Sequence, residues 1–241
     1  MTDLDEILEA ARELAWAGRW QRALSLLDAT PGGFRVAVTA AEVALESDWF
    51  AGTDLATGRL AAAARLGSGW DLDFLRLRHD YLLLLRAGER GDLRDRAAGL
   101  AEAAPDPVRH GWARMYQGLI ADVLLGQRDL APAHYAAALR AGENTDPRLE
   151  REALRHLGDH DRDHGDRAGA YAKWARATEL SGRAGMVPGL LTQQILLAEL
   201  ARDEGDEAGA MLLAREIART AEAVGAHRPY AQAVEFMNGP R

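Results

Sequence analysis

Hydrophobic residues recur every three or four positions along most of this chain, which is the spacing of one face of an α-helix. The first such series is Leu4, Ile7, Leu8, Ala11, Leu14 and Ala15. The same spacing continues in residues 72–85, 115–125, 149–157, 190–200 and 211–217. No stretch alternates β-branched and polar residues in the way that is typical of a half-exposed strand. The pattern therefore predicts an all-α protein.

Short breaks containing glycine or aspartate separate the predicted helices. They are Gly18-Arg19-Trp20, Ser47-Asp48-Trp49, Gly91-Asp92-Leu93, Arg128-Asp129-Leu130, Gly165-Asp166-Arg167 and Gly205-Asp206-Glu207. Glycine adopts the left-handed conformation that ends a helix, and aspartate caps the next one. The breaks predict about six antiparallel helical hairpins, approximately 3–31, 34–66, 71–104, 107–141, 147–181 and 187–224. A short helix at 228–237 is expected to cover the last apolar face, and residues 1–241 are predicted to form a single domain.

Small residues recur at fixed distances from these breaks. Seven residues before each break stand Ala11, Ala40, Leu84, Ala121, Gly158 and Ala198. Five residues after it stand Ala23, Gly52, Arg96, Ala133, Ala170 and Ala210. Small side chains allow the backbones of paired helices to approach closely. The pattern resembles the tetratricopeptide repeat over nearly the whole chain, with the third hairpin as the poorest match. This resemblance implies a right-handed α-α superhelix, that is, a solenoid.

Composition excludes several classes of protein. Asp and Glu outnumber Lys and Arg by 37 to 29, and this acidic balance argues against nucleic acid as the partner. The chain has no cysteine, so disulfides and thiolate chemistry are excluded. The acidic start of the chain is unlike a signal peptide, and no apolar run approaches the ~20 residues that span a bilayer. We therefore expect a cytoplasmic protein with no membrane contact.

No catalytic motif is found in the sequence. The only lysine is Lys173, in Ala172-Lys173-Trp174, so a phosphate-binding loop ending in Gly-Lys-Ser/Thr is excluded. The serines lie in ordinary helical or turn contexts, and the carboxylates are spread along polar helix faces. The chain is accordingly predicted to be neither an enzyme nor a cofactor-binding protein.

Three histidines stand four residues apart on one predicted helix. His156, His160 and His164 share a face with Asp159 and Asp163. Histidines at this spacing can share one metal ion, with a carboxylate completing the site. A polar helix face, whose last histidines are favoured by the helix dipole, explains the same pattern. Both interpretations remain open at this point.

The family resemblance also implies a binding surface, because the first helix of each tetratricopeptide hairpin lines a concave face. The residues carried over to this face are Leu8, Arg12, Phe34, Arg78, Tyr81, Leu85, Met115, Asp122, Glu152, Arg155, Asp159, Arg162, Glu199 and Arg202. The first half is mostly apolar and the second mostly charged, which is typical of a groove for a peptide with a hydrophobic anchor and a polar end. The alternative that Phe34, Tyr81 and Leu85 pack between hairpins remains open.

Three functions follow as hypotheses. The first is a non-catalytic scaffold or adaptor that binds a protein or peptide on the concave face. The second is a regulatory sensor for a small ligand or signalling peptide, and the third is a metal-binding protein built on the three histidines. A homodimer is also plausible, because a solenoid end that exposes leucine and alanine can stack on a second copy.

Overall fold

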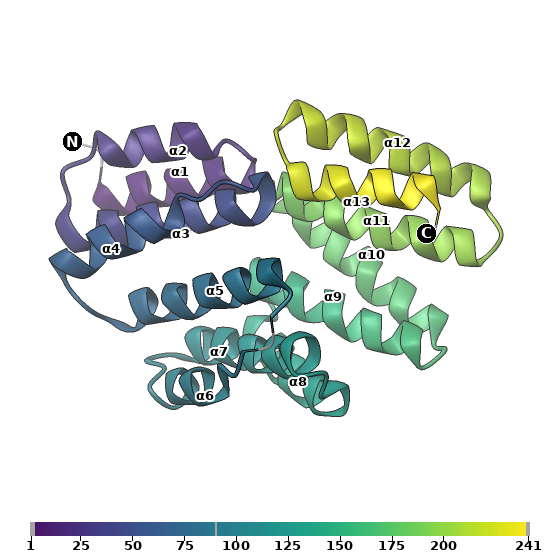
Figure 1. Cartoon of the computed structure of the whole chain (residues 1–241), viewed down its shortest axis with the longest axis horizontal. Helices are drawn as coiled ribbons and strands as arrows, with labels where there is room; N and C mark the ends of the chain where they lie inside the picture. Colours follow the sequence, from purple (N-terminus) through teal and green to yellow (C-terminus); the bar gives the residue numbers. More distant parts are fainter. Residues whose placement is uncertain (1–2, 90, 240–241) are drawn as a thin grey trace. The chain divides into compact units, whose positions relative to one another are not determined.

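The computed structural model describes residues 3–89 and 91–239, and in this part of the chain every regular element is a helix (Figure 1). The all-α prediction is therefore confirmed for these residues. Contacts divide the chain into two compact units, the first comprising Met1–Gly67 with Ser181–Arg241 and the second Ser68–Leu180. The single domain and the superhelix stay predictions.

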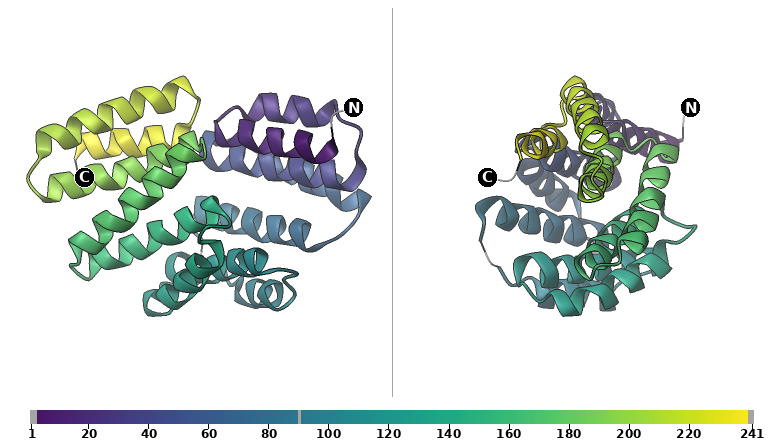
Figure 2. Two further views of the ribbon diagram at one scale, coloured as in Figure 1. Left: turned by 180° about the vertical axis from the view of Figure 1, so that it is seen from behind. Right: turned by 90° about the vertical axis from the view of Figure 1, so that its right-hand side faces the viewer.

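Unit 1 combines helices from both ends of the sequence. Its helices are α1 (Leu4–Trp16), α2 (Trp20–Asp28), α3 (Gly33–Ala51), α4 (Ala56–Leu66), α11 (Val187–Asp203), α12 (Glu207–Ala223) and α13 (His227–Asn238). Consecutive helices pack as hairpins, and α11, α12 and α13 lie together (Figure 2). Helix α13 also contacts α3, where the Arg228 guanidinium lies 4.5 Å from the centre of the Trp49 ring. The expected C-terminal helix is thus present, and it packs against α3 of the second hairpin as well as α11 and α12 of the last.

Unit 2 is continuous in sequence. Its elements are α5 (Trp70–Ala87), α6 (Arg94–Glu102), α7 (Pro107–Leu119), the π-helical turn η1 (Ile120–Leu124), the 3₁₀ turn η2 (Arg128–Leu130), α8 (Ala131–Gly142), α9 (Pro147–Asp163) and most of α10 (Arg167–Arg183). Helix α7 packs against α6, α8 and α9. The central position of α7 places the π-helical turn at its end next to α8 and α9.

Several helix ends have the structure that the breaks predicted. Gly165 and Gly205 adopt φ of +84° and +94°, the left-handed region that a side chain would strain. The aspartates that follow them cap the next helix, since Asp166 accepts from the N–H of Gly169 and Asp206 from that of Gly209, each at 2.9 Å. These two breaks are confirmed as combined stop and start signals.

The break predicted at Ser47-Asp48-Trp49 is wrong, because α3 continues to Ala51. The buried Asp48 carboxylate nevertheless caps α4, since it accepts from the backbone N–H groups of Leu55 at 2.8 Å and Ala56 at 2.9 Å. The aspartate therefore acts from the last turns of one helix on the start of the next.

Two of the expected small-residue positions are also wrong. Gly52 and Ala133 are exposed, and the buried small residues nearest to them are Ala56 and Ala131, each 0% exposed. The register was set by counting from a break. The buried residue lies four positions after the expected one in the first case, because α4 begins only at Ala56, and two positions before it in the second, where α8 begins at Ala131.

Glycines inside α7 and α9 allow close helix crossings in unit 2. A Cβ atom added at Gly118 would lie 2.5 Å from the Tyr135 ring on α8, and one added at Gly158 would lie 2.4 Å from Trp174 Nε1 on α10. Gly111 is equally tight against Ala141. Close approach of paired helices therefore requires the absence of a side chain at these positions.

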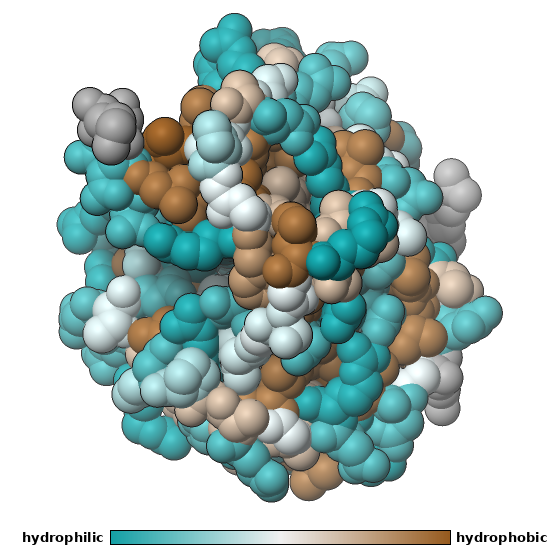
Figure 3. Space-filling view, turned by 90° about the vertical axis from the view of Figure 1, so that its left-hand side faces the viewer, coloured by the Kyte–Doolittle hydropathy of each residue, from teal (hydrophilic) through white to brown (hydrophobic). Residues whose placement is uncertain are grey.

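The surface mixes polar and apolar side chains. Figure 3 shows hydrophobic side chains as separate groups divided by hydrophilic ones on the face that it draws. The large hydrophobic residues that are most exposed include Leu66, Leu130, Tyr171 and Leu212, at 56–62%. Among the described residues, no helix combines the length and apolar character required to cross a membrane.

Candidate functional site

A π-helical turn positions the carboxylate at the centre of the candidate site. Helix α7 does not end at Leu119 but widens into η1, which contains Asp122. A π turn adds a residue to the helical turn and changes the direction of the side chains, and such turns are frequent at functional sites. The Asp122 side chain is only 8% exposed.

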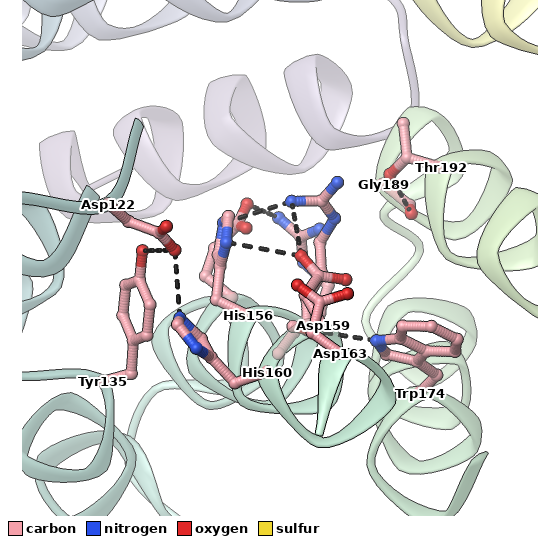
Figure 4. A network of polar contacts seen from close by, with 12 residues as sticks. Asp122, Tyr135, His156, Asp159, His160, Asp163, Trp174, Gly189 and Thr192 are labelled. Carbon is pink, nitrogen blue, oxygen red and sulfur yellow. Dashed lines mark hydrogen bonds and ion pairs between the residues drawn. The ribbon is translucent and has the colours of Figure 1, made fainter. Parts of the chain in front are cut away.

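Asp122 is held by side chains from α8 and α9 (Figure 4). The Tyr135 hydroxyl donates to Asp122 Oδ2 at 3.2 Å, and His160 Nε2 lies 3.0 Å from the same oxygen. Arg128 adds a longer ion pair at 3.6 Å. Burial, and then the Asp122 charge, raise the pKa of Tyr135 well above its usual value, so the phenol remains a proton donor.

His156 lies beside this group as a neutral imidazole. Its ring stacks on Tyr135 with centroids 5.0 Å apart, and its Nε2 atom is 3.1 Å from Arg155 Nη1. Because a guanidinium only donates, His156 Nε2 must accept, which leaves the ring proton on Nδ1, 3.6 Å from Asp159 Oδ2. Burial and then the positive charge of Arg155 lower the pKa of His156 well below its usual value.

Side chains of alternating charge form a row along one face of α9. Glu152, Arg155, Asp159 and Arg162 recur at steps of three or four, which places them on one face of the helix. Glu152 is ion-paired with Arg151, Arg155 is 3.9 Å from Asp159, and the Arg162 guanidinium is 5.8 Å from the Trp174 ring centre. The side chains of Glu152, Arg155 and Asp159 are 24–30% exposed. We define these four residues as the α9 charged row.

The charges in this row stabilise one another. Burial raises the pKa of the Glu152 carboxyl, but the positive charges of Arg151 and Arg155 outweigh this effect, so its pKa is lowered. Burial likewise lowers the pKa of Arg155, but Asp159 and Glu152 outweigh it, and the pKa of Arg155 is raised. Glu152 and Arg155 are therefore both ionised near neutral pH.

The structure places the residues predicted for unit 2 in two different environments. Asp122, Glu152, Arg155, Asp159 and Arg162 come together around α9. The remaining predicted residues of this unit are Arg78, Tyr81, Leu85 and Met115. Leu85 is half-buried, and Arg78 Nε donates to the Tyr116 hydroxyl at 3.3 Å.

Tyr81, Met115 and Asp122 are wrong as surface contacts for a partner. Tyr81 is 2% exposed and packs edge-on against Tyr116, and Met115 is 0% exposed. The Asp122 side chain is directed inward and bonded to Tyr135 and His160. These side chains belong to the interior because the helices of unit 2 pack over them from several sides.

The residues predicted for unit 1 do not form one row either. Leu8 is 3% exposed and is wrong as a contact residue, since it lies in the core of the unit. Arg12 pairs with Glu42 at 3.0 Å, and the Arg202 guanidinium lies 3.6 Å from the Phe236 ring centre. Phe34 and Glu199 are half-buried, and the Phe34 ring covers Gly67.

The three histidines do not converge as a metal site. His160 Nε2 is bonded to Asp122, His156 Nε2 accepts from Arg155, and His164 Nδ1 lies 2.6 Å from the carbonyl of His160. Over residues 3–89 and 91–239, no three His, Cys, Asp or Glu side chains are grouped closely enough to hold a metal ion. The metal interpretation is therefore contradicted, because these imidazoles do not come close enough together to share one ion.

Sequence reasoning missed Tyr135, Arg128 and Arg151. Tyr135 connects the two halves of the site, since it donates to Asp122 and stacks on His156. The one available signal is that Tyr135 is the only aromatic residue in the predicted helix after Arg128-Asp129-Leu130. Nothing in the sequence marks the π-helical turn that directs Asp122 toward it.

The Tyr135 phenol is buried, and its raised pKa keeps it protonated. The His160 imidazole is bonded to the Asp122 carboxylate. Comparison of the chain with family models, curated proteins and solved structures finds no match in any of the three. The fold itself defines the class as an all-α protein of consecutively packed helices.

Proposed function

We propose that the chain is a non-catalytic scaffold or adaptor that binds a peptide or protein segment on the α9 charged row. The observation that carries the proposal is the row itself, in which side chains of alternating charge stay partly exposed yet are fixed by ion pairs and by the Trp174 ring. Charges that are fixed before binding lose little side-chain entropy when a partner arrives. Alternating signs also select the register of a partner that carries the complementary pattern.

The packing of unit 2 supports a binding role. The glycines at Gly118 and Gly158 let α7 pack closely on α8 and α9 on α10, and this close packing favours α9 as a platform of fixed shape. As part of the same proposal, the hairpins are tetratricopeptide-like units of a right-handed superhelix in a cytoplasmic protein that binds neither nucleic acid nor membrane. Self-association into a homodimer belongs to this proposal too.

A selection of random displayed peptides on the purified protein tests this function. Peptides enriched on the wild type should bind Arg162→Glu at least about tenfold more weakly, because the reversed charge meets the partner's own anionic group. Arg219→Glu is the matched control, since Arg219 is 75% exposed on α12 of unit 1 and should leave binding unchanged. Equal binding to all three proteins would place the peptide elsewhere, and the absence of any enriched peptide would contradict the scaffold proposal.

A regulatory sensor for a small ligand is the second candidate. The observation that favours it is the charged, partly exposed Arg155 guanidinium, which neutral His156 orients and which a single small anion could engage. A small anion that raises the melting temperature of the wild type, in the absence of any enriched peptide, would support the sensor over the scaffold.

A further inference from the structure

Arg155 has more hydrogen-bond donors than its surroundings use. A guanidinium carries five N–H donors. Among the described residues, the Arg155 side chain donates one hydrogen bond, from Nη1 to His156 Nε2, and its one ion pair is the 3.9 Å contact from the same Nη1 to Asp159. The edge formed by Nε and Nη2 is therefore not engaged by these residues, and the side chain remains 24% exposed.

The Arg155 guanidinium is also held in one orientation. Its Nη1 donor is fixed by His156, whose ring is stacked on Tyr135 at an interplanar angle of 23°. Tyr135 is in turn fixed because it is fully buried and donates to Asp122. A chain of contacts from the interior thus presents the Nε–Nη2 edge in a defined direction, which is the geometry that a planar two-oxygen anion requires.

The charge around Arg155 selects among anions. Glu152 is already paired with Arg151, and Asp159 lies close to Arg155, so the immediate surroundings are close to neutral. A carboxylate would add one negative charge, and its two oxygens match the two N–H donors of the Nε–Nη2 edge. A phosphate dianion would add two negative charges beside the carboxylates of Glu152 and Asp159, at a larger electrostatic cost.

We propose that Arg155 binds a single carboxylate of the partner through its Nε–Nη2 edge. This inference rests on the proposed function, because it names the chemistry that the α9 charged row recognises. The carboxylate is the side chain of an aspartate or glutamate in a bound peptide, or it belongs to a free organic acid, and both present the same two oxygens. His156 acts as a positioning residue, since it orients the guanidinium without touching the ligand.

The test is a titration of the ¹⁵N-labelled full-length protein, followed at the Nε–Hε resonance of Arg155, which is assigned by its loss in Arg155→Lys. The probes are N-acetyl-glutamate α-amide, its isostere N-acetyl-glutamine α-amide, and inorganic phosphate. We expect a saturable shift with the glutamate compound, none with the glutamine compound, and weaker binding of phosphate. An absent shift, an equal shift with the glutamine compound, or tighter phosphate binding would overturn the proposed carboxylate site at Arg155.

Variants of Arg155, which lack the Arg155 resonance and are therefore titrated through the backbone amide resonances of α9, separate a binding role from a structural one. Arg155→Lys keeps the charge but loses the two parallel N–H donors, and it should bind the glutamate compound about tenfold more weakly. Arg155→Gln should abolish binding. Arg219→Gln should behave as the wild type. If Arg155→Gln unfolds, Arg155→Lys still tests the proposal. A site that does not need the two parallel N–H donors of the guanidinium would bind the glutamate compound as tightly in Arg155→Lys as in the wild type.

The failure of this inference can be distinguished from the failure of the proposed function. Selected peptides that carry no carboxylate and bind Arg155→Gln as tightly as the wild type would overturn the role of Arg155 and leave the scaffold standing. A saturable shift with the glutamate compound in a protein that selects no peptide would support the role of Arg155 and favour the sensor over the scaffold.

Discussion

The substitution Gly158→Ala tests the helix crossing that supports the candidate site. Gly158 lies inside α9, and an added Cβ would be 2.4 Å from Trp174 Nε1 and 2.6 Å from Trp174 Cδ1. These separations are far below van der Waals contact. The indole is rigid and 0% exposed, and its N–H donates to the Arg155 carbonyl at 3.0 Å, so it cannot move without losing a hydrogen bond.

The expected magnitude follows from three terms. Overpacking of a filled core costs about 1–3 kcal/mol. Loss of the indole hydrogen bond costs about 1 kcal/mol. Alanine is favoured over glycine in a helix by about 1 kcal/mol, which offsets part of this cost. We therefore expect Gly158→Ala to lower the free energy of unfolding by about 1–3 kcal/mol.

Urea unfolding, followed by circular dichroism and tryptophan fluorescence, measures this free energy. Gly99→Ala is the matched control, because Gly99 lies in helix α6 of the same unit and an added Cβ there meets nothing within 4 Å. That variant should be more stable than the wild type by about 0.5–1 kcal/mol. If Gly158→Ala proved as stabilising as Gly99→Ala, the close crossing of α9 and α10 would be refuted.

Three further substitutions probe buried polar groups. Tyr135→Phe removes a donor to the Asp122 carboxylate and should cost about 1.5–3 kcal/mol in urea unfolding, whereas the exposed Tyr171→Phe should have no effect. Gln193 is 0% exposed and neither of its amide atoms has a partner among the described residues, so Gln193→Met should raise the melting temperature; a lower one would contradict this reasoning. Because the pKa of His156 is lowered in the folded state, the unfolded state binds more protons below its usual pKa of about 6.5, and stability should fall as the pH drops through and below that value. His156→Gln should reduce this dependence between pH 8 and pH 5, and an unchanged slope would count against it.

Local patterns in the sequence predicted the helices and several of their ends. Gly165-Asp166 works as a stop and a cap because both functions depend only on the backbone next to them. The small residue at Gly158 was predicted for the same reason, since the fifth hairpin keeps the spacing of the repeat. The error at Ser47-Asp48-Trp49 arose because a capping aspartate can also act from inside the preceding helix.

The candidate site was predictable only in part. The α9 charged row follows from helical spacing, so Glu152, Arg155, Asp159 and Arg162 were found together. The inward direction of Asp122 depends on a π-helical turn, and the role of Tyr135 depends on the packing of α8 against α9. Neither the direction of Asp122 nor the role of Tyr135 can be predicted from the local sequence, because both depend on contacts between segments that are distant in the chain.

The composition of unit 1 has a consequence for the order of events during protein synthesis. Unit 2 is one continuous stretch, so it has been synthesised as a whole once the chain has reached Leu180. Helices α1 and α3 are made before unit 2, whereas α11 and α13, which they contact, are made after it. Helices α1 and α3 therefore wait, with part of their surface uncovered, until α11 and α13 have been made. At elongation rates of about 5–20 residues per second this interval lasts on the order of ten seconds, during which the uncovered surfaces of these helices need protection from aggregation.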